Sequence, residues 1–282
     1  MRNFRSRIDG EEEPVTTWVL ETPVFQESGQ RLEDAVRELG HTVVAWDDDW
    51  WSSGHWPTLE GEKVVFHGSL ANAARVHDEL PWRPGSYCDV GAFHCTAWYE
   101  AARPWLLHGD WRVTTAEQLC EDPVAVTQGL ADAEGRVFVR PDSPLKPFSG
   151  RVLRAAEIEP AKLDHGFYFD DLTIPVVVAP VRSVTREWRF VVVGQQIVAG
   201  CEYEASSRTP AGGALTDEAS VLAEKVSASL RPPAEVYVLD LCEADGQLKL
   251  IELNPFGGAD LYECNATAVV EAISSYLSHP RR

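Results

Sequence analysis

Three polar residues near the carboxyl-terminal end of the sequence have the types and spacing to bind a metal ion. Asp240 lies in one apolar run, and Glu252 and Asn254 lie two residues apart in the next. The turn-rich segment 243–247 between the runs predicts a β-hairpin, in which strand alternation puts Glu252 and Asn254 on one face, within reach of Asp240. Two carboxylates and an amide oxygen are hard donors, which Mg²⁺ accepts when it is shared with substrate phosphates. The spacing therefore predicts a magnesium site and indicates ATP as the phosphate compound.

A polar stripe on an exposed strand is the alternative interpretation of these residues. The flanking residues Ile251, Leu253 and Phe256 are apolar, however. A carboxylate among buried neighbours needs a partner, and clustered buried carboxylates usually coordinate a metal or titrate. The metal site is therefore the favoured interpretation.

Phosphates also need cations, and segment 138–150 offers two of them. Arg140 falls at the end of a predicted strand, and Lys146 lies in the loop of small residues that follows. Cations fixed in this way stabilise phosphate charge. The alternative is a solvated pair of surface cations, because single surface charges are weak signals.

Glu187 and Arg189 form a third candidate pair. They alternate with the apolar residues Trp188 and Phe190, so a strand would present both polar side chains on one face. A simple cross-strand ion pair is the alternative to a functional role.

Taken in order, the basic residues of 138–150, the Glu187-Trp-Arg189-Phe segment and the Asp240…Glu252-x-Asn254 pattern resemble the ATP-grasp superfamily of ATP-dependent ligases. They are most similar to a small bacterial and phage clade of that superfamily. The resemblance extends from about residue 138 to residue 262. It implies a mixed α/β chain with an ATP-grasp fold, in which two lobes sandwich a nucleotide behind an α/β amino-terminal domain. It also implies ATP and Mg²⁺ as cofactors.

The resemblance assigns roles to the candidate cations and to their acidic neighbour. Arg140 and Lys146 are expected to contact the phosphates, and Lys146 is also counted among the catalytic residues. The position of Arg140 more often holds lysine, so a planar, bidentate contact replaces a point charge here. Arg189 is expected to stabilise the transferred phosphoryl group, whose charge spreads over several oxygens. Glu187 is expected to orient Arg189 or to meet a nucleotide hydroxyl.

The apolar run 176–181 resembles the hinge between the two lobes, where adenine is held. The resemblance implies that Val178, Ala179 and Val181 contact the base, with backbone atoms of Val178 and Val181 reading its edge. Many members of the superfamily have an acidic residue in this hinge, whereas this chain has Ala179-Pro180. A plain buried strand is the alternative, because short apolar runs are not specific.

The expected activity is that of an ATP-dependent carboxylate–amine ligase that forms an acylphosphate, with a small metabolite or a peptide end as substrate. A phosphotransferase, a nucleic-acid repair ligase and a non-catalytic nucleotide sensor are the alternatives. The net charge of −19 argues against the repair ligase, because binding a phosphate backbone requires a basic surface.

Composition limits the compartment and the partners. The six cysteines contain no CxxC motif, which favours a reduced, cytoplasmic protein. The longest apolar runs are far shorter than the roughly 20 residues of a membrane span, so no membrane partner is expected. Carboxylate and amine substrates are expected as partners, and a homodimer is left open beside a monomer.

The 282 residues are predicted to form three domains. Residues 1–112 alternate strand and helix patterns and predict an α/β domain. Helices are also expected at 97–107 and at 114–120, the second with Thr115 or Thr114 as its N-cap. Residues 113–180 predict a small β-rich lobe, and residues 181–282 predict the lobe that carries the metal site. Nine of the ten tryptophans lie in residues 1–111. They are interpreted as part of a core with an amphipathic rim, with an aromatic substrate platform as the alternative.

Overall fold

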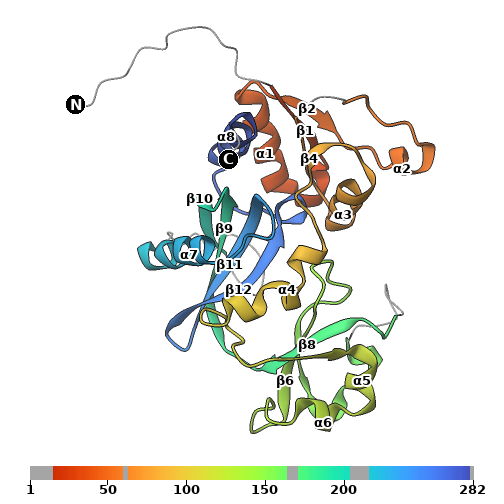
Figure 1. The fold of residues 1–282 in the computed structure, drawn as a ribbon, viewed down its shortest axis with the longest axis vertical. Coiled ribbons are helices and arrows are strands. Elements are labelled where there is room, and N and C mark those ends of the chain that lie inside the picture. The colour runs from red at the N-terminus through yellow and green to blue at the C-terminus, as the bar shows by residue number, and fades with distance from the viewer. Residues whose placement is uncertain (1–14, 60–62, 164–170, 204–215, 280–282) are drawn as a thin grey trace.

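The fold of the computed structural model contains three four-stranded sheets that follow one another down the long axis of the molecule (Figure 1). The structure describes residues 15–59, 63–163, 171–203 and 216–279. Within these residues, no helix has both the length and the apolar character that crossing a membrane requires.

The first sheet is parallel and contains the amino-terminal strands. Across the sheet, the order is β2 (Thr42–Ala45), β1 (Thr16–Leu20), β3 (Lys63–His67) and β4 (Arg83–Gly85). Helices α1 (Gln26–Glu38) and α3 (Leu70–Glu79) follow β1 and β3, and the short helix α2 (Asp49–Ser53) follows β2. The predicted alternation of strands and helices in this part of the chain is confirmed.

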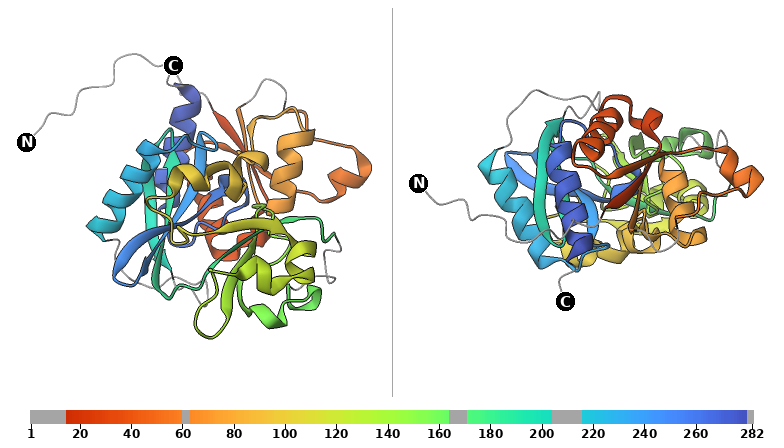
Figure 2. Two further views of the ribbon diagram at one scale, coloured as in Figure 1. Left: turned by 60° about the horizontal axis from the view of Figure 1, so that its bottom comes forward. Right: turned by 90° about the horizontal axis from the view of Figure 1, so that it is seen from above.

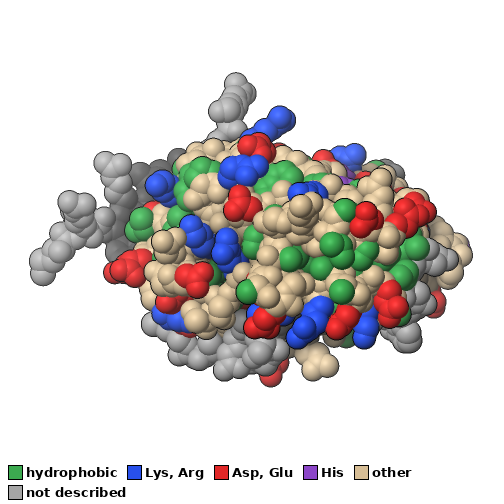
Figure 3. Space-filling view, turned by 90° about the horizontal axis from the view of Figure 1, so that it is seen from below, with side chains coloured by type: hydrophobic (Ala, Val, Ile, Leu, Met, Phe, Trp, Pro, Cys, Tyr) green, Lys and Arg blue, Asp and Glu red, His purple; other side chains and the backbone are tan. Residues whose placement is uncertain are grey.

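The second sheet is antiparallel, and with its two short helices we call it the small lobe. Across the sheet, the order is β5 (Arg112–Thr115), β8 (Pro175–Pro180), β6 (Arg136–Pro141) and β7 (Arg151–Arg154). Helices α5 (Ala116–Glu121) and α6 (Pro123–Thr127) cover one face, where Leu119, Val139 and Val178 share a core. Acidic and basic side chains are interspersed with hydrophobic ones on the described surface of this end of the molecule (Figure 3). That mixed surface differs from the basic stripe typical of nucleic-acid binding.

The third sheet is antiparallel, and with helices α7 and α8 we call it the large lobe. Across the sheet, the order is β10 (Gln196–Tyr203), β9 (Val184–Val193), β11 (Val236–Ala244) and β12 (Gln247–Pro255). Helices α4 (Cys95–Ala102) and α7 (Asp217–Ser229) cover the face that carries Trp188 and Phe190. The opposite face carries the candidate site, so the alternation of β9 separates its packing side from its polar side.

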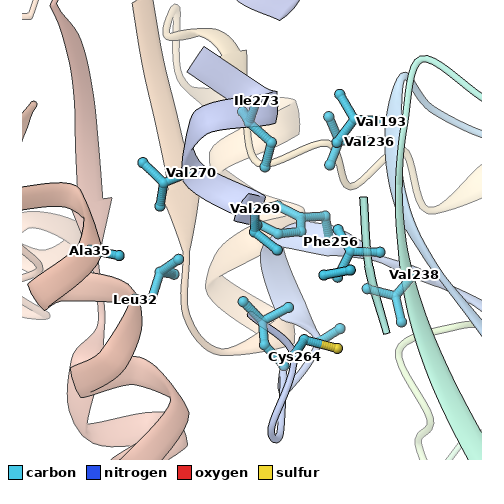
Figure 4. Packing of buried hydrophobic residues seen from close by; sticks show 14 of the residues in the cluster. Leu32, Ala35, Val193, Val236, Val238, Phe256, Cys264, Val269, Val270 and Ile273 are labelled. Atoms are coloured by element: carbon cyan, nitrogen blue, oxygen red, sulfur yellow. The ribbon is translucent and has the colours of Figure 1, made fainter. Parts of the chain in front are cut away.

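Helix α8 (Ala266–Ser278) joins the first sheet to the large lobe through one hydrophobic core. Its residues Val269, Val270 and Ile273 lie between Leu32 of α1 and the end of the third sheet at Val236 (Figure 4). The view from above shows α1 and α8 side by side (Figure 2). The amino-terminal part therefore packs as a continuation of the large lobe, while the small lobe has a core of its own. The domain boundaries at 112 and 180 stay a prediction.

One local expectation is corrected and another is confirmed. The sequence pattern at 97–107 predicts a helix, but α4 ends at Ala102. Pro104 lacks an N–H and disfavours helical backbone in the residue before it, so the helix ends early. The helix expected at 114–120, with Thr115 or Thr114 as N-cap, is confirmed as α5, which begins at Ala116 with Thr115 as its N-cap. Both threonines also pair with β8.

The tryptophan-rich segment packs against the first sheet. Trp46, Trp50, Trp51 and Trp56 are half-buried and contact one another in edge-on or tilted geometry over the core beneath. Ring edges and faces carry opposite partial charge, so this arrangement stabilises the cluster beyond burial alone. The arrangement supports the interpretation of these tryptophans as a rim of the core.

Candidate active site

A cavity of about 390 Å³ lies between the small lobe and the polar face of the large lobe. The amino-terminal part closes one side with Phe25 and Leu70. Six of the residues that the sequence singles out line this cavity, and they are Arg140, Lys146, Glu187, Arg189, Glu252 and Asn254. The structure thus gathers side chains from three distant segments of the chain around one space.

The register of the third sheet aligns the central residues of the site. Asp240 of β11 is the register partner of Arg189 on one side and of Glu252 on the other. Side chains opposite one another on adjacent strands share a face, so these three form a row across β9, β11 and β12. A β-bulge follows Asp240 in the hairpin. The hairpin that the sequence predicts is confirmed.

Arg189 and Asp240 form a bidentate ion pair inside the large lobe. Arg189 Nε donates to Asp240 Oδ1 at 2.9 Å, and Nη2 donates to Oδ2 at 2.7 Å. Asn254 Nδ2 donates to the same Oδ2 at 3.0 Å, and Arg189 Nη1 donates to the Asp260 carbonyl at 2.5 Å. Burial raises the pKa of Asp240, and the charge and hydrogen bonds of Arg189 act in the opposite direction. The pair fixes the guanidinium while its remaining N–H groups stay available at the cavity.

Glu252 links the two lobes across the cavity. Its Oε2 accepts from Arg140 Nη2 at 2.9 Å, and its Oε1 accepts from Lys146 Nζ at 3.0 Å. Burial alone would raise the pKa of Glu252, but the charges of Lys146 and Arg140 outweigh burial and hold that pKa well below its usual range. Glu252 is therefore ionised, and it holds both candidate phosphate-binding cations.

The loop that follows β6 lines the cavity and lies close to the sheet at Gly150. A Cβ atom on Gly150 would lie 2.8 Å from the ring of Phe138, so a side chain at this position would displace that ring. Lys146 has a backbone φ of 49°, in the left-handed region that non-glycine residues rarely adopt. Such conformations persist where surrounding structure determines them, often at binding sites.

Glu187 has a different environment from the other acids of the site. No cation of the described residues forms a salt bridge with it, and its side chain is hydrogen-bonded to Tyr203. Burial raises the pKa of Glu187, and nearby Asp240 and Glu252 add to the effect. Asp240, and not Glu187, is therefore the acid that pairs with Arg189, and Glu187 lines the cavity.

None of the three predicted hinge residues lines the cavity. Val178 and Ala179 are fully buried in β8, a central strand that pairs with both β5 and β6. Ala179 is the register partner of Phe138, whose ring does line the cavity. Val181 follows the last paired residue, Pro180, so its backbone lies beyond the ladder. The sequence could not separate these positions, since an apolar run has no period that shows which residues face a ligand.

Several residues of the site carry no signal in the sequence. Tyr203 and Tyr262 stack with ring centroids 4.7 Å apart, and the Arg189 guanidinium lies 4.7 Å from the Tyr262 ring. The His108 imidazole stacks on Phe138 at 4.6 Å, and burial lowers the pKa of His108 to about 4. Single aromatic residues without a spacing pattern could not be assigned to a site before the chain is folded.

The predicted metal-binding residues fit a shared rather than a fully protein-bound cation. Within the described part of the chain, no group of three or more His, Cys, Asp or Glu side chains could hold a metal ion by itself. Glu252 and Asn254 line the cavity, and Asp240 lies directly beneath them. Because Asn254 donates its Nδ2 to Asp240, its Oδ1 is the amide atom left for a cation. Glu252 and Asn254 thus offer oxygens that suit a Mg²⁺ ion shared with phosphates and water. Both oxygens of the fully buried Asp240 already accept hydrogen bonds from Arg189 or Asn254.

The fold and the cavity define the chain as an ATP-grasp protein. Among solved structures, D-cycloserine synthetase DcsG is similar at 17% identity and a TM-score of 0.63, over 93% of this chain and 99% of that one. The ligase PsnB in complex with its minimal precursor is similar at 14% identity and a TM-score of 0.58, over 93% and 99% of the two chains. The D-alanine–D-alanine ligase of Bacillus anthracis in complex with ATP is similar at 11% identity and 0.59, over 95% and 99%. At these identities the likeness shows the shared fold.

The family of the chain is more specific than its fold. The model of the ATP-grasp domain, R2K clade family 3, matches residues 67–273, more than half of the chain, and the chain belongs to this family. No curated protein matches the sequence. The ATP-grasp fold and the superfamily expected from the sequence are thus confirmed.

Proposed function

We propose that the protein is a Mg²⁺-dependent ligase that uses ATP to join a carboxylate to an amine through an acylphosphate. The observation that carries the proposal is the arrangement around one cavity of three cations from two lobes beside the oxygens of Glu252 and Asn254. Phosphoryl transfer requires positioning and charge stabilisation more than covalent chemistry by the protein. The cavity supplies groups for both.

The residues of the cavity divide between binding and catalysis. Arg140 and Lys146 bind the phosphates of ATP, exchanging the carboxylate of Glu252 for phosphate oxygens. Mg²⁺ held by Glu252 and Asn254, with the charge of Asp240 beneath them, would offset phosphate charge when bound. Arg189 donates to the γ-phosphoryl group, and Glu187 accepts a hydrogen bond from a nucleotide hydroxyl.

Adenine is proposed to lie against the wall formed by Phe138 and supported by β8. Ala179 shares the face of the sheet that carries Phe138, and Val178 packs in the core on the opposite face. The backbone of Val181, beyond the strand, reads the edge of the base. The base would thus lie near residues 180–184, where the chain leaves β8 of the small lobe and enters β9 of the large lobe.

The proposed reaction has two steps, which are phosphoryl transfer and amide formation. A substrate carboxylate oxygen attacks the γ-phosphorus, the bond to the bridging oxygen breaks, and ADP leaves. The amine nitrogen then attacks the acyl carbon and loses a proton as phosphate leaves, which forms the amide. Arg189 is fixed before the reaction by Asp240, so it stabilises the developing charge without reorganisation.

The neighbouring structures indicate the range of substrates. One solved relative is a D-alanine–D-alanine ligase and another is bound to a precursor peptide, which supports an amino-acid-like molecule or a peptide as the substrate of this chain. The six free cysteines support a cytoplasmic location. The homodimer stays a prediction.

Trapping the acylphosphate tests the proposed function. The protein is incubated with ATP, Mg²⁺, hydroxylamine and a panel of amino-acid and peptide carboxylates, and hydroxamate and ADP are measured together. Equal amounts of both products with one carboxylate would support the ligase. A stable phosphate ester without hydroxamate would indicate a phosphotransferase instead. ADP release by Glu252→Gln at the wild-type rate would place the active site elsewhere.

A further inference from the structure

Two cysteine thiols meet at the edge of the candidate active site. Cys201 lies in β10, and Cys264 lies between the 3-10 helix at 256–258 and α8. Their Sγ atoms are 3.4 Å apart, although the residues are 63 positions apart in the sequence. Both side chains are buried. Of the six free cysteines, these are the two whose thiols contact each other in the structure.

The pair contacts the backbone that holds Arg189. Cys201 is the register partner of Arg189 in the neighbouring strand. Cys264 Sγ lies 3.8 Å from the Arg189 carbonyl oxygen, and Cys201 Sγ lies 3.9 Å from that of Leu261. Segment 259–264 therefore touches β9 and β10 through these two thiols.

The same segment supplies part of the site. The Asp260 carbonyl accepts a hydrogen bond from Arg189, and Tyr262 stacks on Tyr203 beneath the Arg189 guanidinium. Ala259, Asp260 and Tyr262 line the cavity. A change in the position of segment 259–264 would thus change the groups that fix Arg189.

We propose that Cys201 and Cys264 are a redox modification site, which a peroxide oxidises to a disulfide that ties segment 259–264 to β10. One thiol attacks the peroxide, forming a sulfenic acid and releasing water. The second thiol attacks the sulfenic sulfur, an S–S bond forms, and a second water leaves. Two thiols are oxidised, and one peroxide is reduced to two waters.

Cys201 is the thiol that reacts first with the peroxide. The contact with Cys264 lowers the pKa of Cys201, and the charge of Arg189 acts in the same direction, whereas burial and the charge of Asp240 oppose the shift. A thiolate is the nucleophile in such reactions, and nearby positive charge promotes it. Cys264 then lies in contact, in the place of the resolving thiol.

Closing the disulfide moves segment 259–264 more than it moves β10. An S–S bond is about 2.05 Å long, so the two sulfurs must approach from 3.4 Å. Strand β10 is held by its pairing with β9, whereas 259–264 is irregular backbone. The approach therefore displaces the Asp260 carbonyl and Tyr262 relative to Arg189. A loss of nucleotide binding follows, and this consequence rests on the proposed function.

Cysteine mapping tests the modification directly. Reduced protein is treated with one equivalent of hydrogen peroxide, alkylated and digested for mass spectrometry. The expected result is a cross-linked Cys201–Cys264 peptide, loss of two alkylation sites, and return of both sites after dithiothreitol. Cys201→Ser and Cys264→Ser should each abolish the cross-link. The matched control Cys242→Ser, which changes a buried thiol in β11 of the same sheet, should retain it. Sulfinic acid at either cysteine without a cross-link, or a cross-link at other cysteines, would overturn the proposal.

A binding measurement separates this inference from the proposed function. Titration calorimetry with Mg·ATP compares reduced wild type, oxidised wild type and Cys201→Ser after peroxide, and Cys201→Ala serves if the serine variant does not fold. Oxidation should weaken binding about tenfold in wild type only, which corresponds to about 1.4 kcal/mol. If reduced protein binds no ATP while the cross-link forms, the proposed function fails and the modification site stands. If reduced protein binds ATP and the cross-link does not form, the redox site alone fails. Equal affinity of reduced and oxidised wild type for Mg·ATP would refute the proposed effect of the disulfide on nucleotide binding.

Discussion

The two ion-pair clusters of the cavity differ in how their partners are held. Arg189 and Asp240 lie on adjacent strands of one sheet, and their side chains are 8% and 1% exposed. Glu252 pairs with Arg140 and Lys146 of the other lobe, and the Lys146 side chain is 33% exposed. The first pair is fixed by the sheet register. The second depends on the distance between lobes and on a loop, so it can exchange one anionic partner for another.

This difference assigns the clusters different tasks. A buried, fully hydrogen-bonded pair preorganises a guanidinium, since its orientation is set before substrate arrives. Cations on a loop and on a second lobe can follow a ligand, since lids and loops commonly close over bound nucleotides. We therefore expect substitutions in the Arg189–Asp240 pair to act on stability and chemistry, and substitutions at Glu252 to act on the contact between lobes.

Asp240→Asn is expected to give the largest loss of stability. It leaves the buried Arg189 charge without its anionic partner, and breaking a buried pair in this way costs about 3–5 kcal/mol. Urea unfolding of wild type and variant measures the change. Asn254→Ala, which removes a single hydrogen bond to the same carboxylate, is the control and should cost much less. Equal losses in the two variants would show that the ion pair has no special role.

Arg189→Lys is expected to lower kcat by about 10²–10³ while ATP affinity changes less. Removing one preorganised donor has effects of this size, and an ammonium cannot reproduce the two-pronged contact of a guanidinium. Steady-state kinetics with a substrate from the hydroxamate screen, together with ATP titration, measures the two quantities separately. Weaker ATP binding with unchanged kcat would make Arg189 a ground-state binding residue.

Glu252→Gln is expected to cost about 1–3 kcal/mol at neutral pH, because it leaves buried charged donors poorly paired. The pKa of Glu252 is lower in the folded protein than in the unfolded chain. The ionised group therefore stabilises the fold fully above the unfolded value of about 4.3, and this contribution is lost as pH falls from there towards the folded pKa. The stability difference between wild type and variant should narrow below that pH. A difference that stays constant on acidification would contradict this account of Glu252.

Glu100→Gln should have no measurable effect on stability. Glu100 and Arg103 have the same 2.7 Å contact as Arg189 and Asp240, but Glu100 is 74% exposed. Exposed pairs contribute little because water and salt screen them. A loss comparable to that of Asp240→Asn in the same urea experiment would mean that burial does not explain the contrast between the pairs.

The parts of the site that follow from local patterns could be predicted from the sequence. Glu252 and Asn254 share a face because a strand alternates with period two, and the β11–β12 hairpin follows from a short turn between two apolar runs. The alternation of Trp188 and Phe190 with polar residues predicts the two faces of β9 in the same way.

The parts that depend on long-range pairing could not be predicted. Nothing in the sequence shows that β9 pairs with β11. That pairing makes Asp240, and not Glu187, the acidic partner of Arg189. The core shared by α1 and α8 likewise joins opposite ends of the chain. The burial of Val178 and Ala179, neither of which lines the cavity, depends on β8 being a central strand. The early end of α4 is different, because Pro104 was available as a signal.

Titration of the protein with ATP, with and without Mg²⁺, tests the central claim most directly. Calorimetry at fixed salt should show one ATP site per chain that tightens when Mg²⁺ is present, and ATP should bind more strongly than GTP. The melting temperature should rise with the concentration of Mg·ATP, because a ligand that binds only the folded protein stabilises it by mass action. The added stability is about 2.7 kcal/mol at a hundredfold excess over the dissociation constant. The absence of both binding heat and a melting shift at millimolar Mg·ATP would contradict the claim that this cavity is a nucleotide site.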